Sequence, residues 1–84
     1  MADYAEEDQK ILIQVGANIK RLRKEQDISQ EKLAVLAHLD RAYVGAVERG
    51  TRNISILNLS KIANALNREA SEIVKMPGSN GGYD

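Results

Sequence analysis

Two short helical segments joined by only three residues constrain this 84-residue chain more than any other feature. One follows Ser29 and runs to about Ala37, and the other follows Asp40 and ends at Gly50. Serine and aspartate are favoured helix N-caps, and glycine favours the position directly after a helix. The linker, residues 38–40, suits a tight turn and is too short for a loop with its own structure. The pattern predicts a helix-turn-helix.

The segment before this pair also repeats its apolar residues at helical spacing. Leu12, Val15 and Ile19 lie three or four positions apart, with polar residues between them that would face water. This pattern predicts a first helix that ends near Gln26 and Asp27.

Two more helices are predicted after the pair. Ser55 can cap a fourth helix, and Asn67 stands where a left-handed residue can end it. A final short helix covers about Ala70 to Lys75. No alternating run rich in Val, Ile or Thr predicts a strand, so we expect an all-α fold of five short helices.

Both ends of the chain differ in composition from its middle. Residues 1–8 hold four acids and no basic residue, and Pro77 begins an end segment that contains three glycines. We therefore expect a flexible acidic N-terminus at 1–8, one folded domain at 9–76 and a disordered tail at 77–84. No run is long enough to span a bilayer and no signal-peptide pattern is present, so we expect a cytoplasmic protein.

The set of reactive residues argues against an enzyme. The chain has no cysteine and a single histidine, His38, which cannot form a metal cluster by itself. It also lacks paired carboxylates for acid-base work, a nucleophile with a base, and a phosphate-binding loop. We predict no catalytic residue, no metal, no cofactor and no small-molecule ligand.

The net charge of zero hides an uneven distribution. Residues 9–75 carry all twelve Lys and Arg against seven acids, a surplus of 12 − 7 = +5. Between residues 41 and 68 five basic residues accompany a single acid, Glu48. Such a local surplus is compatible with a polyanionic partner but does not require one.

The helical pair and the segment after it resemble a known family. "ISQEKLAVLAHLDRAYVGAVERG", followed by "RNISILNLSKIANALN", is similar to the Cro/phage-repressor (XRE-type) helix-turn-helix domain over about residues 15–75. More narrowly, "LDRAYVGAVERGTRNIS" resembles the controller proteins of restriction-modification systems, which are small dimeric autoregulators. The resemblance implies a lambda-repressor-like fold, double-stranded DNA as partner, and a homodimer on a palindromic operator.

The resemblance also implies roles for individual residues. The helix after Asp40 would read bases through its exposed face: Arg41, Ala42, Tyr43 and Ala46. Phosphates would meet the start of the preceding helix and the loop after the reading helix: Ser29, Gln30, Arg49, Thr51, Arg52 and Asn53. A partly buried ion pair between Arg23 and Glu48 would tie the first helix to the reading helix.

Elementary chemistry supports the leading assignments and leaves alternatives open. The guanidinium of Arg41 can bond guanine O6 and N7 together, a contact worth about 1–3 kcal/mol of discrimination. Tyr43 can offer its hydroxyl to a base or phosphate, or it can pack its ring over the turn. At the level of the whole protein, an adaptor that binds other proteins through the same fold is the alternative to a DNA-binding regulator.

Two residues stand where the family often has glycine. They are His38 in the turn and Asn67 after the fourth helix. Histidine and asparagine are both enriched at positive φ among non-glycine residues. We therefore expect a left-handed backbone at each position.

Two questions about apolar and small residues stay open at this level. Four residues near the end of the domain can form a dimer interface or close the monomer core: Leu66, Ile73, Val74 and Met76. Gly45 lies inside the reading helix, where glycine costs about 1 kcal/mol against alanine. We interpret Gly45 as leaving the exposed face of that helix without a long side chain, so that the helix can approach DNA closely.

Overall fold

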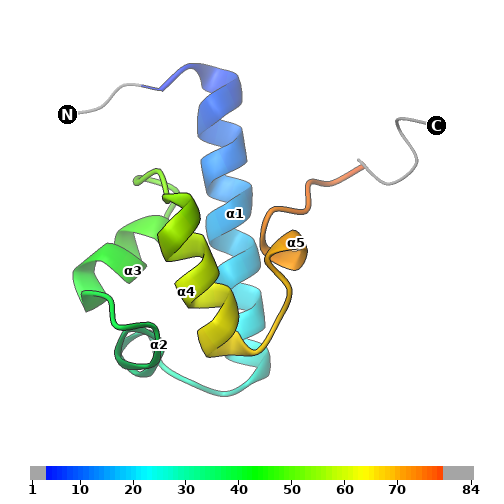
Figure 1. Ribbon diagram of the computed structural model, residues 1–84. Coiled ribbons are helices and arrows are strands. Elements are labelled where there is room, and N and C mark those ends of the chain that lie inside the picture. The colour runs from blue at the N-terminus through cyan, green and yellow to red at the C-terminus, as the bar shows by residue number, and fades with distance from the viewer. Residues whose placement is uncertain (1–3, 79–84) are drawn as a thin grey trace.

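The computed structural model describes residues 4–78, which form five α-helices and no strand (Figure 1). Their bounds are α1 Glu6–Glu25, α2 Gln30–Ala37, α3 Arg41–Glu48, α4 Ile56–Leu66 and α5 Ala70–Ile73. Helix α3 packs on α1 and α2, α2 also packs on α4, and α5 contacts α1 and α4. The expected all-α, five-helix fold is confirmed, and α2 and α3 are the predicted helix-turn-helix.

The helix ends differ from the predicted ends at two places. Helix α1 begins at Glu6, before the predicted start of the folded domain at residue 9, so part of the segment predicted to be flexible is helical. Its first turn holds Glu6, Glu7 and Asp8, and carboxylates are stabilising near the positive end of a helix dipole. Helix α5 ends at Ile73 instead of continuing to Lys75. Residues 1–3 and 79–84 lie outside the described residues.

The helix caps follow the sequence at two of three predicted positions. The Ser29 hydroxyl accepts a hydrogen bond from the backbone N–H of Lys32 at 3.0 Å, and Ser55 does the same for Asn58 at 3.1 Å. Asp40 occupies the N-cap position of α3 with an extended backbone, but its side chain makes no cap hydrogen bond. That prediction was right about the position and wrong about the interaction.

The two predicted left-handed residues, His38 and Asn67, are confirmed, whereas a third, Asp27 with φ 58° after α1, was not predicted. His38 has φ 57° at the end of α2, and Asn67 has φ 55° at the end of α4. Gly50 follows α3 with φ 78° and lies against the backbone of Ile13. His38, Asn67 and Gly50 redirect the chain after α2, α4 and α3 respectively.

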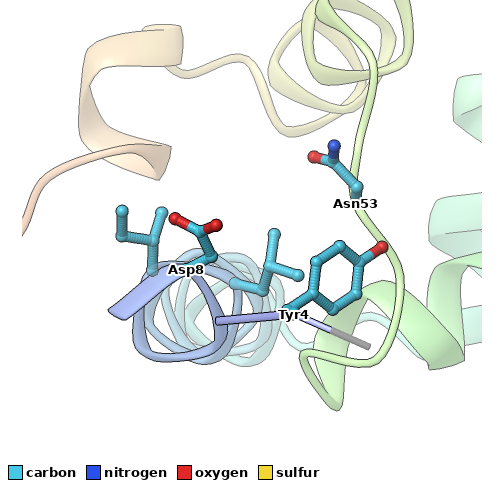
Figure 2. A pocket seen from close by; sticks show the side chains of 5 residues that line it. Tyr4, Asp8 and Asn53 are labelled. Carbon is cyan, nitrogen blue, oxygen red and sulfur yellow. The ribbon is translucent and has the colours of Figure 1, made fainter. Parts of the chain in front are cut away.

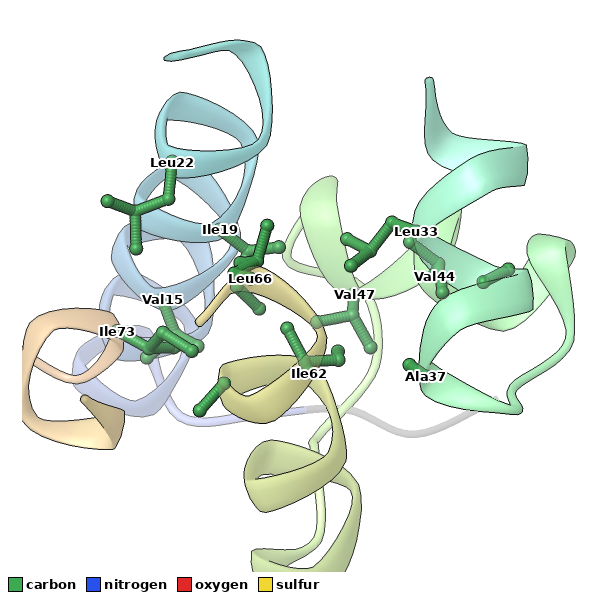
Figure 3. Close-up of a cluster of buried hydrophobic side chains, with 12 residues drawn as sticks. Val15, Ile19, Leu22, Leu33, Ala37, Val44, Val47, Ile62, Leu66 and Ile73 are labelled. Atoms are coloured by element: carbon green, nitrogen blue, oxygen red, sulfur yellow. The ribbon is translucent and has the colours of Figure 1, made fainter. Parts of the chain in front are cut away.

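Side chains from all five helices meet in one core (Figure 3). Its largest fully buried members are Ile19, Leu22, Leu33, Val44, Val47, Ile62, Leu66 and Ile73. The open question about Leu66 and Ile73 is thereby settled against the dimer interface, because both are fully buried within the monomer. Met76 also packs against this core, whereas Val74 is 44% exposed.

Candidate nucleic-acid interface

A buried ion pair fixes helix α3 to α1. Arg23 Nε donates to Glu48 Oε2 at 2.8 Å, and Nη2 donates to Oε1 at 3.1 Å. The two side chains are only 9% and 2% exposed, so the pair is more deeply buried than the sequence suggested. A third donor, Gln30 Nε2, reaches Glu48 Oε1 at 2.9 Å. Such a bidentate, fully bonded pair holds the end of α3 in one orientation.

Gln30 therefore has a different environment from the one expected. Its amide nitrogen donates one N–H to Glu48, and its oxygen lies near Gly45. The second N–H of the same nitrogen is the donor that can meet a phosphate while the bond to Glu48 stays in place. The backbone amides at the start of α2 keep the orientation that suits a phosphate.

Gly45 does not lie on the open face of α3, where the sequence placed it. The residue is buried, and a methyl group there would lie 3.4 Å from Arg49 Nη1 and 3.4 Å from Gln30 Oε1. The glycine instead lies beneath the side chains of Arg49 and Gln30.

A different glycine makes the close approach. A methyl group at Gly16 in α1 would overlap the backbone carbonyl oxygens of Val47 and Glu48 in α3. The two helix backbones therefore touch at this point, and only glycine fits. Gly16 was not singled out from the sequence, although a glycine inside an amphipathic helix is a signal of such contact.

The start of α3 is the part that faces away from the protein. Arg41 and Ala42 are exposed, and Ala46 is half-buried one turn later. Exposed basic residues continue beyond the helix with Arg49 and Arg52. The arrangement leaves the predicted base-reading turn open to a partner, with the basic side chains of the following loop beside it.

Tyr43 combines the two interpretations that the sequence left open. It is half-buried against the core, and its hydroxyl accepts a hydrogen bond from Asn58 Nδ2 of α4 at 3.1 Å. The guanidinium of Arg52 lies over its ring, 5.1 Å from the centroid. Sequence reasoning missed Asn58, because nothing in a linear pattern pairs residues 43 and 58 across two helices.

The loop after α3 is held by its own contacts. Thr51 donates its hydroxyl to the carbonyl oxygen of Ala46 at 3.0 Å, and Gln9 Nε2 donates to the carbonyl oxygen of Gly50 at 2.7 Å. Asn53 is exposed and lies across a shallow hollow of about 260 Å³ from Tyr4 and the start of α1 (Figure 2). The hydroxyl of Thr51 is therefore engaged at the end of α3, and the side chain of Asn53 lies on the side of the loop that faces α1.

Two further features concern the described part of the chain: a metal cluster and a membrane-spanning helix. Residues 4–78 contain no group of three or more His, Asp or Glu side chains arranged to hold a metal ion. Within the same residues, no helix has the length and apolar character needed to cross a membrane.

Comparison with known proteins agrees with the geometry. The model of the helix-turn-helix family HTH_3 matches residues 19–73. Control protein C.MunI from a Mycoplasma species is 45% identical over 64 residues, covering 75% of this chain and 86% of that protein. The crystal structure of the restriction-modification controller protein C.AhdI from Aeromonas hydrophila has a TM-score of 0.73 at 48% identity, over 74% of this chain and 94% of that one. A hypothetical transcription factor from Neisseria has a TM-score of 0.78 at 34% identity, over 95% of this chain and 91% of that one.

A small all-helical domain that presents the first turn of α3 beside exposed basic residues has the architecture of a DNA-binding transcription regulator. The family match over residues 19–73 makes the assignment specific: this chain belongs to the XRE-type (HTH_3) helix-turn-helix family.

Proposed function

We propose that this regulator binds a palindromic operator as a homodimer and controls restriction-modification genes, its own gene included. The observation that carries the proposal is the exposed first turn of α3, which is rigidly mounted by the buried Arg23–Glu48 pair. The similarity to C.MunI and C.AhdI, which are restriction-modification control proteins, supports the choice of target genes. The protein would act in the cytoplasm, on the nucleoid.

In this proposal the bases are read from the start of α3. Arg41 is exposed there and can present its planar fork to guanine O6 and N7 in the major groove. Ala42 and Ala46 are small and can contact a thymine methyl group. Tyr43 adds a hydroxyl at the edge of the same turn.

Phosphates would be met on both sides of α3. The Ser29 hydroxyl occupies the backbone amide of Lys32, so the first two amides of α2 are the ones that can receive a phosphate. Arg49 and Arg52 are exposed in the loop that follows α3, and they can bind phosphates on the other side of the major groove. These contacts fix the register of α3 in the groove and carry no sequence information themselves.

One copy of the domain covers one half-site, so a palindromic operator needs a two-fold dimer. Since Leu66 and Ile73 are buried, we place the dimer contact on the exposed apolar residues at the start of α4. Ile56 and Leu57 are 77% and 73% exposed, which is unusual for side chains of this kind. Val74, directly after α5, is large, apolar and still exposed, and it marks the second candidate surface.

The experiment that tests the proposal is selection of bound sites from random double-stranded DNA. The expected result is an inverted repeat whose half-sites are centred about 10–11 base pairs apart, or a multiple of that spacing. Weak binding to all sequences, together with tight binding to another protein, would support the adaptor alternative instead.

Two variants then distinguish base recognition from binding to the phosphate backbone. Arg41→Ala should lower the ratio of operator to random affinity at one base pair in each half-site, with a loss of about 1–3 kcal/mol. Arg52→Ala should weaken binding to all sequences and reduce the slope of affinity against salt. An unchanged affinity ratio in Arg41→Ala would remove that residue from base reading.

The dimer has its own test. Ile56→Lys and Leu57→Lys place charges on the surface proposed for the contact and should yield monomers in sedimentation at micromolar concentration. Val74→Lys tests the second candidate surface in the same way. A wild-type monomer at that concentration, or a dimer that survives both α4 variants, would contradict this placement.

A further inference from the structure

The cluster of Tyr43, Asn58 and Arg52 joins three parts of the chain beside the reading turn. Tyr43 is in the first turn of α3, Arg52 is in the following loop, and Asn58 is in the first turn of α4 (Figure 1). Asn58 is itself held in place, because its backbone N–H donates to the cap hydroxyl of Ser55 at 3.1 Å. A side chain at the proposed interface is thus oriented by a helix that is not part of the helix-turn-helix.

The direction of the hydrogen bond decides what the hydroxyl can do. A phenol hydroxyl carries one proton and can also accept. Asn58 Nδ2 is the donor in its bond to Tyr43, so this bond uses an acceptor site of the hydroxyl and leaves the proton available. Within residues 4–78, the Tyr43 hydroxyl donates to no protein group.

The ring is held as well as the hydroxyl. The guanidinium of Arg52 covers the face of Tyr43 at 5.1 Å, and the ring packs against the core. Contacts at both the hydroxyl and the ring reduce the rotamer freedom that a side chain would otherwise lose on binding. The hydroxyl proton therefore belongs to a preorganised side chain.

We propose that Asn58 is a positioning residue for DNA recognition, which commits the Tyr43 hydroxyl to donate a hydrogen bond to an acceptor atom of the DNA. The acceptors available in the major groove are guanine O6 and N7, adenine N7 and thymine O4, and phosphate oxygens lie beside the groove. Cytosine, which offers only an amino donor in that groove, cannot take this bond. The inference rests on the proposed function, since it concerns the same interface.

A double-mutant cycle tests the inference. Affinity for the selected operator is measured for wild type, Tyr43→Phe, Asn58→Ala and the double variant. Tyr43→Phe keeps the ring under Arg52 and removes only the hydroxyl, and it should bind about three- to tenfold more weakly. Asn58→Ala should show a loss of similar size in wild type and almost none in the Tyr43→Phe background.

The cycle also distinguishes positioning from a structural role. If Asn58 merely stabilised α4, its loss would weaken binding equally in both backgrounds. Asn64→Ala is the matched control, because Asn64 is exposed on the same helix and lies nearly two turns away. Thermal unfolding establishes that each variant is folded, and an unchanged salt slope establishes that the phosphate contact of Arg52 is intact.

Two forms of DNA identify the acceptor. If it is a base atom, Tyr43→Phe and Asn58→Ala relax selection at the same base pair, and replacing the purine by its 7-deaza analogue reproduces the loss when N7 is the acceptor. If the acceptor is a phosphate, operator and random DNA weaken equally and a methylphosphonate at one position reproduces the loss. Either pattern supports the donor role.

Failure of the role of Asn58 can be distinguished from failure of the proposed function. Equal losses from Asn58→Ala in the Tyr and Phe backgrounds, or no loss in either, overturn the role of Asn58 and leave the proposed function standing. A wild-type protein that selects no sequence from random DNA overturns both.

Discussion

Helix α1 has two sides that are held in different ways. On the side of α3, backbone touches backbone at Gly16, and the Arg23–Glu48 pair is almost completely buried. On the side of α5, the ion pairs of Arg68 with Glu25 and Glu72 are one-third to one-half exposed. Charges withdrawn from water must be fully paired, whereas exposed pairs are screened and tolerate change. The α3 side is thus built for fixed geometry, and it carries the proposed DNA interface.

The α5 side has one buried polar contact of its own. Asn18 Nδ2 donates to the carbonyl oxygens of Ile73 at 2.8 Å and Lys75 at 2.9 Å. This amide closes the end of the domain onto α1, away from the proposed DNA-binding face. Substitutions on the α5 side should therefore change stability without changing recognition, and those on the α3 side should change both.

The largest effect is expected when the buried pair is broken. Arg23→Ala leaves the Glu48 carboxylate buried with only the Gln30 amide, which should destabilise the fold by about 3–5 kcal/mol in denaturant unfolding. Arg21→Ala is the matched control, because its pair with Glu25 is half-exposed and should contribute at most about 1 kcal/mol. Similar losses of stability in Arg23→Ala and Arg21→Ala would contradict the difference proposed between the buried and the exposed ion pairs of α1.

The backbone contact on the α3 side should be the next most sensitive. Gly16→Ala places a methyl group on the carbonyl oxygens of Val47 and Glu48, so α1 and α3 must separate. We expect a loss of about 1–3 kcal/mol in stability and a parallel loss of operator affinity, because α3 moves. A variant with wild-type stability would show that the two helices can part without strain.

The amide on the α5 side should matter for stability alone. Asn18→Ala removes both bonds to the chain after α5 and should cost about 1–2 kcal/mol. Amide hydrogen exchange should rise around residues 73–76 while the amides of α3 stay protected. Faster exchange in α3 would mean that the two sides of α1 are coupled more closely than their contacts indicate.

A methyl group added at Gly45 should raise the free energy of unfolding, whereas one added at Gly16 should lower it. It would meet only the ends of the flexible Arg49 and Gln30 side chains at 3.4 Å, and alanine favours a helix by about 1 kcal/mol over glycine. Gly45→Ala should therefore raise the free energy of unfolding by up to about 1 kcal/mol, with operator affinity unchanged within about twofold. Loss of affinity at equal stability would restore the interpretation that this glycine serves approach to DNA.

The smallest expected effect is the loss of stability at acidic pH when Glu72 is protonated. The hydrogen bond from Arg68 and the capping bond from the Glu69 backbone lower the pKa of Glu72 below its ordinary 4.5. A lowered folded-state pKa adds stability above pH 4.5, and that stability is lost as the pH falls through the folded value. Wild type should therefore exceed Glu72→Gln in melting temperature at neutral pH, and the difference should shrink below pH 4.5. A difference that is constant with pH would contradict the role of the charge.

The local features of the fold were predictable because each depends on neighbours in the chain. Ser29 and Ser55 cap helices through backbone groups three residues away, and His38 and Asn67 accept positive φ for intrinsic steric reasons. Where local signals were weak, the predictions failed. Asp40 lies at the cap position without a side-chain bond, and the acidic start of α1 is helical although its charge suggested flexibility.

The site was predictable only in outline. The family resemblance predicted the Arg23–Glu48 pair, and the structure contains it. The contacts of Tyr43 with Asn58 and Arg52 depend on how α3, α4 and their loop fold together, and no periodicity encodes that. The DNA contacts of Arg41 and its neighbours stay predictions for the experiments above.

The sequence by itself determined the number of helices, the turn between α2 and α3, and the family, because caps, left-handed positions and apolar spacing are short-range signals. Only the tertiary structure decided which residues are inside. It placed Leu66 and Ile73 in the core, covered Gly45, and brought the backbone of α1 at Gly16 against that of α3. Burial and approach are set by the relative positions of whole helices, which is a long-range property that a linear pattern does not contain.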